Sequence, residues 1–144
     1  MWFNPLLAGL LRSPLHNLLS RNTMLITVRG RKTGRPVTTP VNYLRFQDEL
    51  MMVSLRSRTW WRNLRGGAPV ELLLAGARRK ATASVFEAEV DVRRGLADMV
   101  SQSPALARPL RIGLDETGSP RAPDLARAAQ SRVIIRAELT SRQA

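Results

Sequence analysis

The sequence predicts a β-rich α+β fold in which about six short strands, mostly antiparallel, form a small barrel with helices packed around it. Short runs rich in β-branched and aromatic residues recur along the chain, separated by Gly, Pro and polar turn residues. A few helical patterns lie between these runs, and there is no internal repeat. A length of 144 residues suits one domain with its own hydrophobic core. We therefore expect a single domain over residues 1–144.

The N-terminal segment is predicted to be helical. Leucines recur there at spacings of three and four, which is typical of an amphipathic helix. Two polar-Pro steps mark helix starts, so we expect short helices near residues 5–12 and 14–20. One interpretation is that they cover an end of the barrel. The other is an interfacial helix, with Trp2 and Phe3 in lipid and nearby arginines at the head groups.

Three strands are expected next, at Met24–Arg29, Val37–Phe46 and Leu50–Leu55. Residues 47–49 are polar and read as the hairpin turn between the second and third strands. Pro40 cannot donate to a strand ladder, so part of the second strand should be an edge or contain a bulge.

The remaining elements follow from the same signals. Thr59 is a candidate N-cap for a short helix that Gly66-Gly67 would end, and Gly76-Ala77 is the predicted turn of a second hairpin. In order, we expect a helix at 60–64, strands at 70–75 and 78–86, a helix at 90–100, a loop at 101–123, a helical segment at 124–129 and a last strand at 132–139.

The chain is strongly basic. Lys and Arg total 23 against 11 Asp and Glu, giving a net charge of +12. Such an excess favours anionic partners: nucleic acid, anionic lipid, or a phosphorylated or polycarboxylate ligand. The alternative is an arginine-rich surface whose charges are simply solvated.

Several chemistries are excluded or disfavoured by the residues present. The chain has no cysteine, which excludes disulfides, thiolate metal sites and Cys nucleophiles. A single histidine, His16, is too few for a His-based metal site, so no metal is expected. No Ser-His-Asp arrangement or paired carboxylates are apparent. Difficult chemistry would therefore need an organic cofactor.

The first local candidate is the segment 29–36, which places four cations in eight residues between two predicted strands. Gly30 and Gly34 permit positive φ, and successive backbone N–H groups in such a turn can form an anion-binding nest. Arg and Lys side chains would add charge-assisted hydrogen bonds to phosphate or carboxylate oxygens. The alternative is an exposed basic hairpin loop.

The second candidate is the segment 54–64, which leaves a strand and enters a helix. It contains Arg56 and Arg58 followed by Trp60 and Trp61. Indole rings can stack on a flat ligand or on guanidinium groups, and a helix N-terminus attracts anions. The alternative is that the tryptophans belong to the core and the arginines are solvated.

Residues 26–64 together resemble the deazaflavin-dependent nitroreductase/quinone reductase family. The matching features are a strand leading into the turn at 30–34, a strand with threonines and proline, a hairpin, a Val-Ser strand end and a Trp-aromatic-x-Asn-Leu helix at 60–64. The resemblance implies a split β-barrel and coenzyme F-420, an 8-hydroxy-5-deazaflavin with a phosphate and an oligoglutamate tail. It implies hydride transfer to a quinone, enone or nitro-type acceptor.

The resemblance also implies roles for particular residues. By this analogy Arg31, Lys32 and Thr33 hold the phosphate or tail, Asn42, Tyr43, Val53 and Ser54 line the ring, and Trp60 and Asn63 shape the pocket wall. Arg56 and Arg58 lie where the family has a longer loop with a phosphate contact, and they are further cofactor-binding candidates. Ser54 or Tyr43 would bond to the acceptor and are the candidate catalytic residues.

Two departures and two alternatives accompany this interpretation. The loop between Ser54 and Trp60 is shorter than is usual in the family, and Tyr43 is the only tyrosine, whereas the nitroreductase branch has later ones. A split barrel that binds FMN through the same turn is the first alternative. A non-enzymatic basic module for nucleic acid or anionic membrane is the second, although seven aromatic residues are few for nucleic acid and none is expected as a partner.

Location and assembly are expectations of the same kind. No stretch has the length and apolarity of a membrane span, and the N-terminus lacks the basic region and cleavage site of a signal peptide. We expect a cytoplasmic protein, peripheral at the inner face of the membrane if the N-terminal helix binds lipid. Both a monomer and a homodimer are compatible with the sequence.

Overall fold

The structure is a computed structural model that describes residues 23–140. The helices expected near 5–12 and 14–20 lie outside the described residues. Within residues 23–140, no helix has the length and hydropathy of a membrane-spanning segment.

The described chain contains six strands, two α-helices and two short 3-10 helices. Their bounds are β1 (Thr23–Arg29), β2 (Pro36–Phe46), β3 (Glu49–Leu55), η1 (Trp60–Leu64), β4 (Ala68–Leu74), β5 (Ala77–Phe86), α3 (Glu89–Gln102), η2 (Pro104–Leu106), α4 (Ala122–Gln130) and β6 (Arg132–Leu139). Every strand predicted from the sequence is present, and the last one has the predicted bounds.

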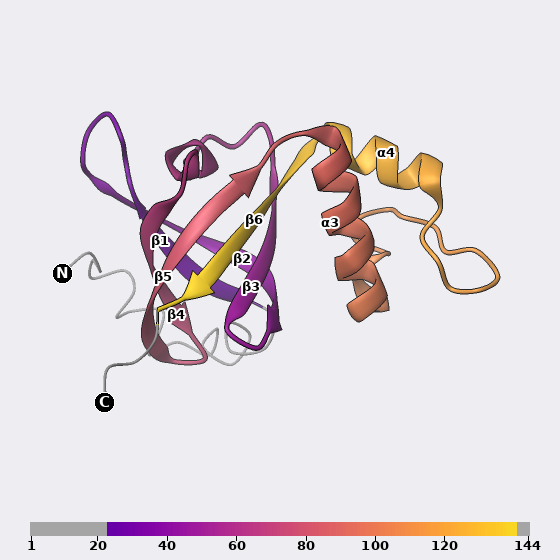
Figure 1. The fold of residues 1–144 in the computed structure, drawn as a ribbon, viewed down its shortest axis with the longest axis horizontal. Helices are drawn as coiled ribbons and strands as arrows, with labels where there is room; N and C mark the ends of the chain where they lie inside the picture. Colours follow the sequence, from indigo (N-terminus) through magenta and orange to yellow (C-terminus); the bar gives the residue numbers. More distant parts are fainter. Residues whose placement is uncertain (1–22, 141–144) are drawn as a thin grey trace. The chain divides into compact units, whose positions relative to one another are not determined.

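The six strands form a closed barrel in the order β1-β2-β3-β6-β5-β4 (Figure 1). The pairs β1–β2, β1–β4, β2–β3 and β4–β5 are antiparallel. The predicted β-rich barrel is thus confirmed.

The core of the barrel consists of one face of each strand. Ile26 on β1 is opposite Leu72 on β4, and both side chains are 0% exposed. On β1, five consecutive residues from Met24 to Val28 are buried, so both faces of this strand are covered. Burying one such aliphatic side chain contributes about 1.5–3 kcal/mol, so packing fixes β1 firmly.

Pro40 occupies the position that its chemistry predicts. β2 pairs with β1 from Pro36 to Asn42, but with β3 only from Tyr43 to Phe46. Within residues 23–140, Pro40 therefore has a strand partner only on the β1 side. Its missing N–H breaks no ladder hydrogen bond on the other side. The expected edge is confirmed.

The second hairpin turns one residue earlier than predicted. Ala75 and Gly76 form the turn, with φ of 50° and 79°, and Leu74 pairs with Ala77. A two-residue turn of this kind needs positive φ at both positions, which an alanine rarely adopts. The prediction placed the turn at Gly76-Ala77 because it could not anticipate a strained Ala75.

Three smaller corrections concern element ends. Glu49 starts β3 and does not belong to the preceding turn. Thr59 occupies the N-cap position of η1, but its side chain makes no capping hydrogen bond. The segment expected to be a loop, 101–123, contains the end of α3, the 3-10 helix η2 and the start of α4.

The described chain divides into two compact units. The first contains residues 23–52, 59–85 and 135–140, and the second contains residues 53–58 and 86–134. The first unit holds most of the barrel, and the second holds α3 and α4. The single-domain organisation stays a prediction.

In the second unit, α3 packs closely on the start of β6. A Cβ placed on Gly95 would lie 2.8 Å from Cγ1 of Ile134 and within 3.4 Å of two more of its carbons. Real Cβ atoms do not approach that closely, so glycine is required for the helix and strand to meet.

We predict that Gly95→Ala destabilises the protein by about 1–3 kcal/mol, because overpacking outweighs the gain in helix propensity. Ile134→Ala alone should cost about 2–5 kcal/mol. Since the clash is absent when both are changed, the double variant should be more stable than the sum of the single effects. Urea denaturation of the four proteins measures this coupling, and strictly additive effects would contradict the close contact.

Candidate functional site

The basic turn, residues 29–36, connects β1 to β2 in the first unit. Arg29 and Pro36 are the last paired residues of the two strands. Beyond them the amide of Gly30 donates to the carbonyl of Arg35 at 2.8 Å, and the amide of Gly34 donates to the carbonyl of Gly30 at 2.8 Å. The turn is therefore closed by its own main chain.

Both glycines of the basic turn are needed for this geometry. A Cβ on Gly30 would lie 2.9 Å from Oγ1 of Thr33, and Gly34 has a φ of 70°. Oγ1 of Thr33 accepts a hydrogen bond from the amide of Arg35 at 3.2 Å. That bond leaves the Thr33 hydroxyl hydrogen free to be donated to a ligand.

The basic turn has a high density of positive charge and no acid in its own sequence. Arg29, Arg31, Lys32 and Arg35 are all exposed. The turn contains no Asp or Glu, and Asp48 is the first acid of the whole chain. Among the described residues, none accepts a hydrogen bond from the amides of Lys32 or Thr33. Arg29 donates to the carbonyl of Gly34 at 3.3 Å. The two amides, the Thr33 hydroxyl and the side chains of Arg31, Lys32 and Arg35 are thus the donors that the turn offers to an anion.

Asn63 of η1 ties the basic turn to the rest of the first unit. Its Oδ1 accepts a hydrogen bond from the amide of Arg31 at 3.0 Å, and its Nδ2 donates to the carbonyl of Trp60 at 2.9 Å. A Cβ on Gly66 would lie 3.9 Å from a guanidinium nitrogen of Arg31, so this side chain runs back along the loop after η1. Asn63 therefore positions Arg31, a role that the sequence did not reveal.

The two tryptophans of η1 belong to the core. Trp60 is 7% exposed and Trp61 is 3% exposed. The guanidiniums of Arg62 and Arg65 lie 5.7 Å and 5.3 Å from the Trp61 ring centroid, within the range of cation–π contacts. Trp60 can support a pocket wall only from beneath, because little of its ring reaches the surface.

Asn42 and Tyr43 lie on opposite faces of β2, as neighbouring strand residues do. Asn42 is exposed and opposite Thr23, whose hydroxyl donates to its Oδ1 at 2.9 Å. Tyr43 is half-buried and opposite the fully buried Met52. Burial raises the pKa of Tyr43 above its ordinary value, and the charge of Arg45 opposes the shift. The phenol therefore stays protonated near neutral pH.

Four candidates belong to the second unit. Val53 is half-buried, and Ser54 is 6% exposed with its hydroxyl donating to the carbonyl of Leu55 at 3.2 Å. The amide of Arg56 donates to the carbonyl of Ser131 at 2.8 Å, and its guanidinium donates to the carbonyl of Glu87. Arg58 is exposed. Arg56 thus links three segments of the second unit to one another, whereas the charged side chain of Arg58 lies at the surface.

Among residues 23–140, no group of three or more His, Cys, Asp or Glu side chains is placed to hold a metal ion. The donors gathered in the basic turn are cationic or neutral, and such donors suit an anionic ligand.

The sequence matches one known family. Residues 14–108 match the family described as F-420H(2)-dependent quinone reductase, which is well over half of the chain. The matched range includes the basic turn and η1. A comparison with curated proteins finds no match.

Several solved structures are similar in fold. An F-420-H2-dependent reductase is 18% identical, with a TM-score of 0.50 over 83% of this chain and 95% of that chain. A putative pyridoxamine 5'-phosphate oxidase from Listeria innocua is 16% identical, with a TM-score of 0.51 over 95% and 92%. The heme storage protein HutZ from Vibrio cholerae is 14% identical, with a TM-score of 0.52 over 99% and 93%. At these identities the likeness concerns the fold, and it supports the split barrel.

We predict that Asn63→Ala frees the basic turn without unfolding the protein. Loss of two hydrogen bonds should cost about 1–3 kcal/mol and speed hydrogen exchange at the Arg31 amide. Asn63→Asp is the matched control, since it keeps the oxygen that accepts from Arg31. Exchange followed by NMR should show protection retained in Asn63→Asp and lost in Asn63→Ala. Equal protection in both would refute the positioning role.

Proposed function

We propose that this chain, which belongs to the F-420H(2)-dependent quinone reductase family, holds the anionic end of coenzyme F-420 in the basic turn and transfers hydride to a quinone-type acceptor. Membership of the family makes the chain an F-420-dependent oxidoreductase. The observation that carries the proposed site is the acid-free, cationic turn at residues 29–36, whose main chain is already ordered.

The groups of the basic turn suit this coenzyme. Its phosphate and oligoglutamate tail need several donors and no competing carboxylate. Arg31, Lys32 and Thr33 offer two side-chain cations, one hydroxyl and two backbone amides in one short turn. Because the turn is pre-formed, binding costs less ordering entropy than it would on a flexible loop.

The bound deazaflavin supplies the hydride, so the chain itself needs neither a nucleophile nor a metal. What remains for the chain is to orient the ring and the acceptor and to place a proton. A quinone that accepts a hydride also takes up one proton to become the hydroquinone. We assign the donation of this proton to Tyr43, because a phenol is protonated at neutral pH and burial raises the pKa of Tyr43 further above its ordinary value.

The other ring-lining candidates receive narrower roles. Asn42 lies on the opposite face of β2 from Tyr43, so the two cannot both line one face of a ring. Trp60 is an apolar candidate of the first unit, and Val53 is an apolar candidate of the second. Ser54 is the second candidate for the acceptor contact, although its hydroxyl already donates to the carbonyl of Leu55.

Assays decide which acceptor is reduced and whether F-420 or FMN is the cofactor. The family description favours a quinone, and enone and nitro-type acceptors are the alternatives to compare with it. FMN carries one phosphate and would use the same turn, so it is the competing ligand. Family membership favours the reductase over a module that binds nucleic acid or membrane.

We predict that Arg31→Ala with Lys32→Ala weakens coenzyme F-420 binding at least about tenfold, since charge-assisted hydrogen bonds are worth about 1.5–3 kcal/mol each. Fluorescence titration with F-420 and with FMN measures both affinities. The pair Arg93→Ala and Arg94→Ala is the matched control, because it removes two exposed cations from α3. Equal losses in the two double variants would mean that net charge, and not the turn, governs binding.

A second prediction concerns Tyr43. Tyr43→Phe should lower kcat for a quinone by about 10–100-fold while the affinity for F-420 changes little, because only the proton donor is removed. The ring keeps its place beside Met52, so the melting temperature should stay within about 2 °C of the parent. Steady-state kinetics with F-420H(2) tests this, and an unchanged kcat would exclude Tyr43 as the donor.

A further inference from the structure

Residues 54–58, which we call the β3 corner, form the turn by which the chain leaves β3. They belong to the second unit. The hydroxyl of Ser54 and the amide of Arg58 both donate to the carbonyl of Leu55, at 3.2 Å and 3.1 Å. The corner that carries the acceptor candidate Ser54 is therefore an ordered turn.

The side chain of Arg56 ties the β3 corner to the segment that leads into α3. Its guanidinium donates to the main-chain carbonyl of Glu87, which lies two residues before the helix begins. The side chain is half-buried at this position. A guanidinium is planar and carries its donors in fixed directions, so this bond fixes the corner as well as the side chain.

The main chain of Arg56 has a second support in Ser131, whose carbonyl accepts from the Arg56 amide at 2.8 Å. Ser131 lies between α4 and β6. Its hydroxyl donates to the carbonyl of Ala128 at 3.4 Å and accepts from Nη1 of Arg132 at 3.2 Å. Arg56 thus holds the β3 corner at two points, through its side chain and through its amide.

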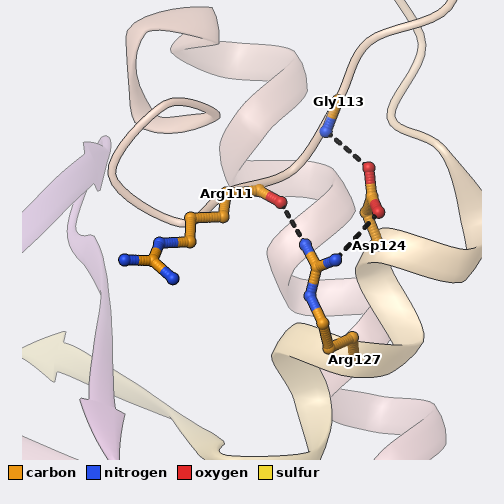
Figure 2. A network of polar contacts seen from close by, with 4 residues as sticks. All are labelled: Arg111, Gly113, Asp124 and Arg127. Atoms are coloured by element: carbon orange, nitrogen blue, oxygen red, sulfur yellow. Dashed lines mark hydrogen bonds and ion pairs between the residues drawn. The ribbon is translucent and has the colours of Figure 1, made fainter.

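The start of α4 is fixed by a separate network, as Figure 2 shows. Asp124 accepts from the amide of Gly113 at 2.8 Å and forms an ion pair with Arg127 at 3.3 Å. Arg127 also donates to the main-chain carbonyl of Arg111. Asp124 lies in the first turn of α4, whereas Ser131 follows its last turn. Replacing Asp124 should therefore loosen the second unit without removing a described hydrogen bond of the β3 corner.

Arg56 and Arg58 differ in how their charged groups are held, although the sequence predicted a coenzyme contact for both. The side chain of Arg58 is exposed and has no partner among the described residues. The guanidinium of Arg56 is anchored on the carbonyl of Glu87 in a half-buried position. Losing this anchor would loosen the turn that begins at Ser54, two residues earlier in the chain.

We propose that Arg56 is a positioning residue of the acceptor site, which fixes the β3 corner and through it Ser54, and that it does not bind the coenzyme. The inference rests on the proposed function, because it takes Ser54 as a contact of the acceptor. A bond to a carbonyl needs only a donor of sufficient reach, whereas a contact to a phosphate depends on positive charge. Misplacing a reacting group by about 1 Å can lower a rate by about 100-fold, so a residue that only orients Ser54 can govern turnover.

The test compares Arg56→Met, which has no donor, with Arg56→Lys, whose ammonium can still donate to the carbonyl of Glu87. With F-420H(2) and a quinone, kcat/KM should fall at least about tenfold in Arg56→Met and stay within about threefold of the parent in Arg56→Lys. The Kd for F-420, from fluorescence titration, should stay within about twofold of the parent in both. Because no ligand charge is involved, added salt should not change the ratio of Arg56→Met to parent.

Three further variants serve as controls. In a Ser54→Ala background, Arg56→Met should lower kcat/KM by less than about twofold further, because the side chain that it positions is gone. Asp124→Ala should lower the melting temperature and leave kcat/KM near that of the parent. Arg94→Met removes an exposed arginine of α3 and should change neither quantity.

Several results would overturn the proposal. A weaker affinity for F-420 in Arg56→Met would make Arg56 a coenzyme contact. Equal kinetics in Arg56→Met and Arg56→Lys, or independent effects of Arg56→Met and Ser54→Ala, would exclude positioning of Ser54. An equal loss of kcat/KM in Asp124→Ala would mean that lower stability accounts for the effect.

Hydrogen exchange at the Arg58 amide separates this inference from the proposed function, because it needs no turnover. Exchange should be faster in Arg56→Met than in the parent and in Arg56→Lys, since the turn that protects this amide is loosened. Unchanged exchange in Arg56→Met would contradict the positioning itself. A parent that reduces no quinone with F-420H(2) would instead contradict the proposed function.

Discussion

The central constraint on this structure is that four like charges in the basic turn must be held together without an acid among them. Exposed charges a few ångströms apart interact by about 1 kcal/mol or less in water, so repulsion is modest but always opposes order. The interactions that oppose it include two main-chain bonds across Gly30, the hydrogen bond from Arg29 to the carbonyl of Gly34, the acceptor Oδ1 of Asn63 and the small size of both glycines. A carboxylate would hold the turn equally well, but it would occupy the cations that an anionic ligand needs.

The barrel provides the rigid base for this arrangement. β1 enters the turn as a run of five buried residues and is paired on both sides, with β2 and with β4. Its end at Arg29 therefore cannot shift without disturbing the packed core. η1 contributes the second anchor, because Trp60 and Trp61 are buried while Asn63 reaches the turn. The basic turn is therefore a surface turn that is fixed at two points. Such a fixed turn suits recognition of a ligand's charged end better than a mobile loop would.

The sequence predicted what is encoded locally and missed what depends on distant contacts. Runs of β-branched and aromatic residues between turn signals predicted all six strands, and Pro40 correctly marked an edge. The turn at Ala75 was placed one residue late because local preference argues against positive φ at alanine. The role of Asn63 could not be predicted, since its partner Arg31 is 32 residues away in the chain.

The net charge of +12 can be interpreted only from the positions of the charged residues. If it were simply a solvated surface, acids and cations would be interspersed, and pairs such as Arg136 with Glu49 would be the rule. Instead, no acid precedes Asp48 in the chain, so the basic turn contains none of its own. A chain that must bind a polyanionic coenzyme gains twice from this separation. Long-range attraction speeds encounter, and the proposed site at the basic turn contains no acid of its own that would compete with the ligand.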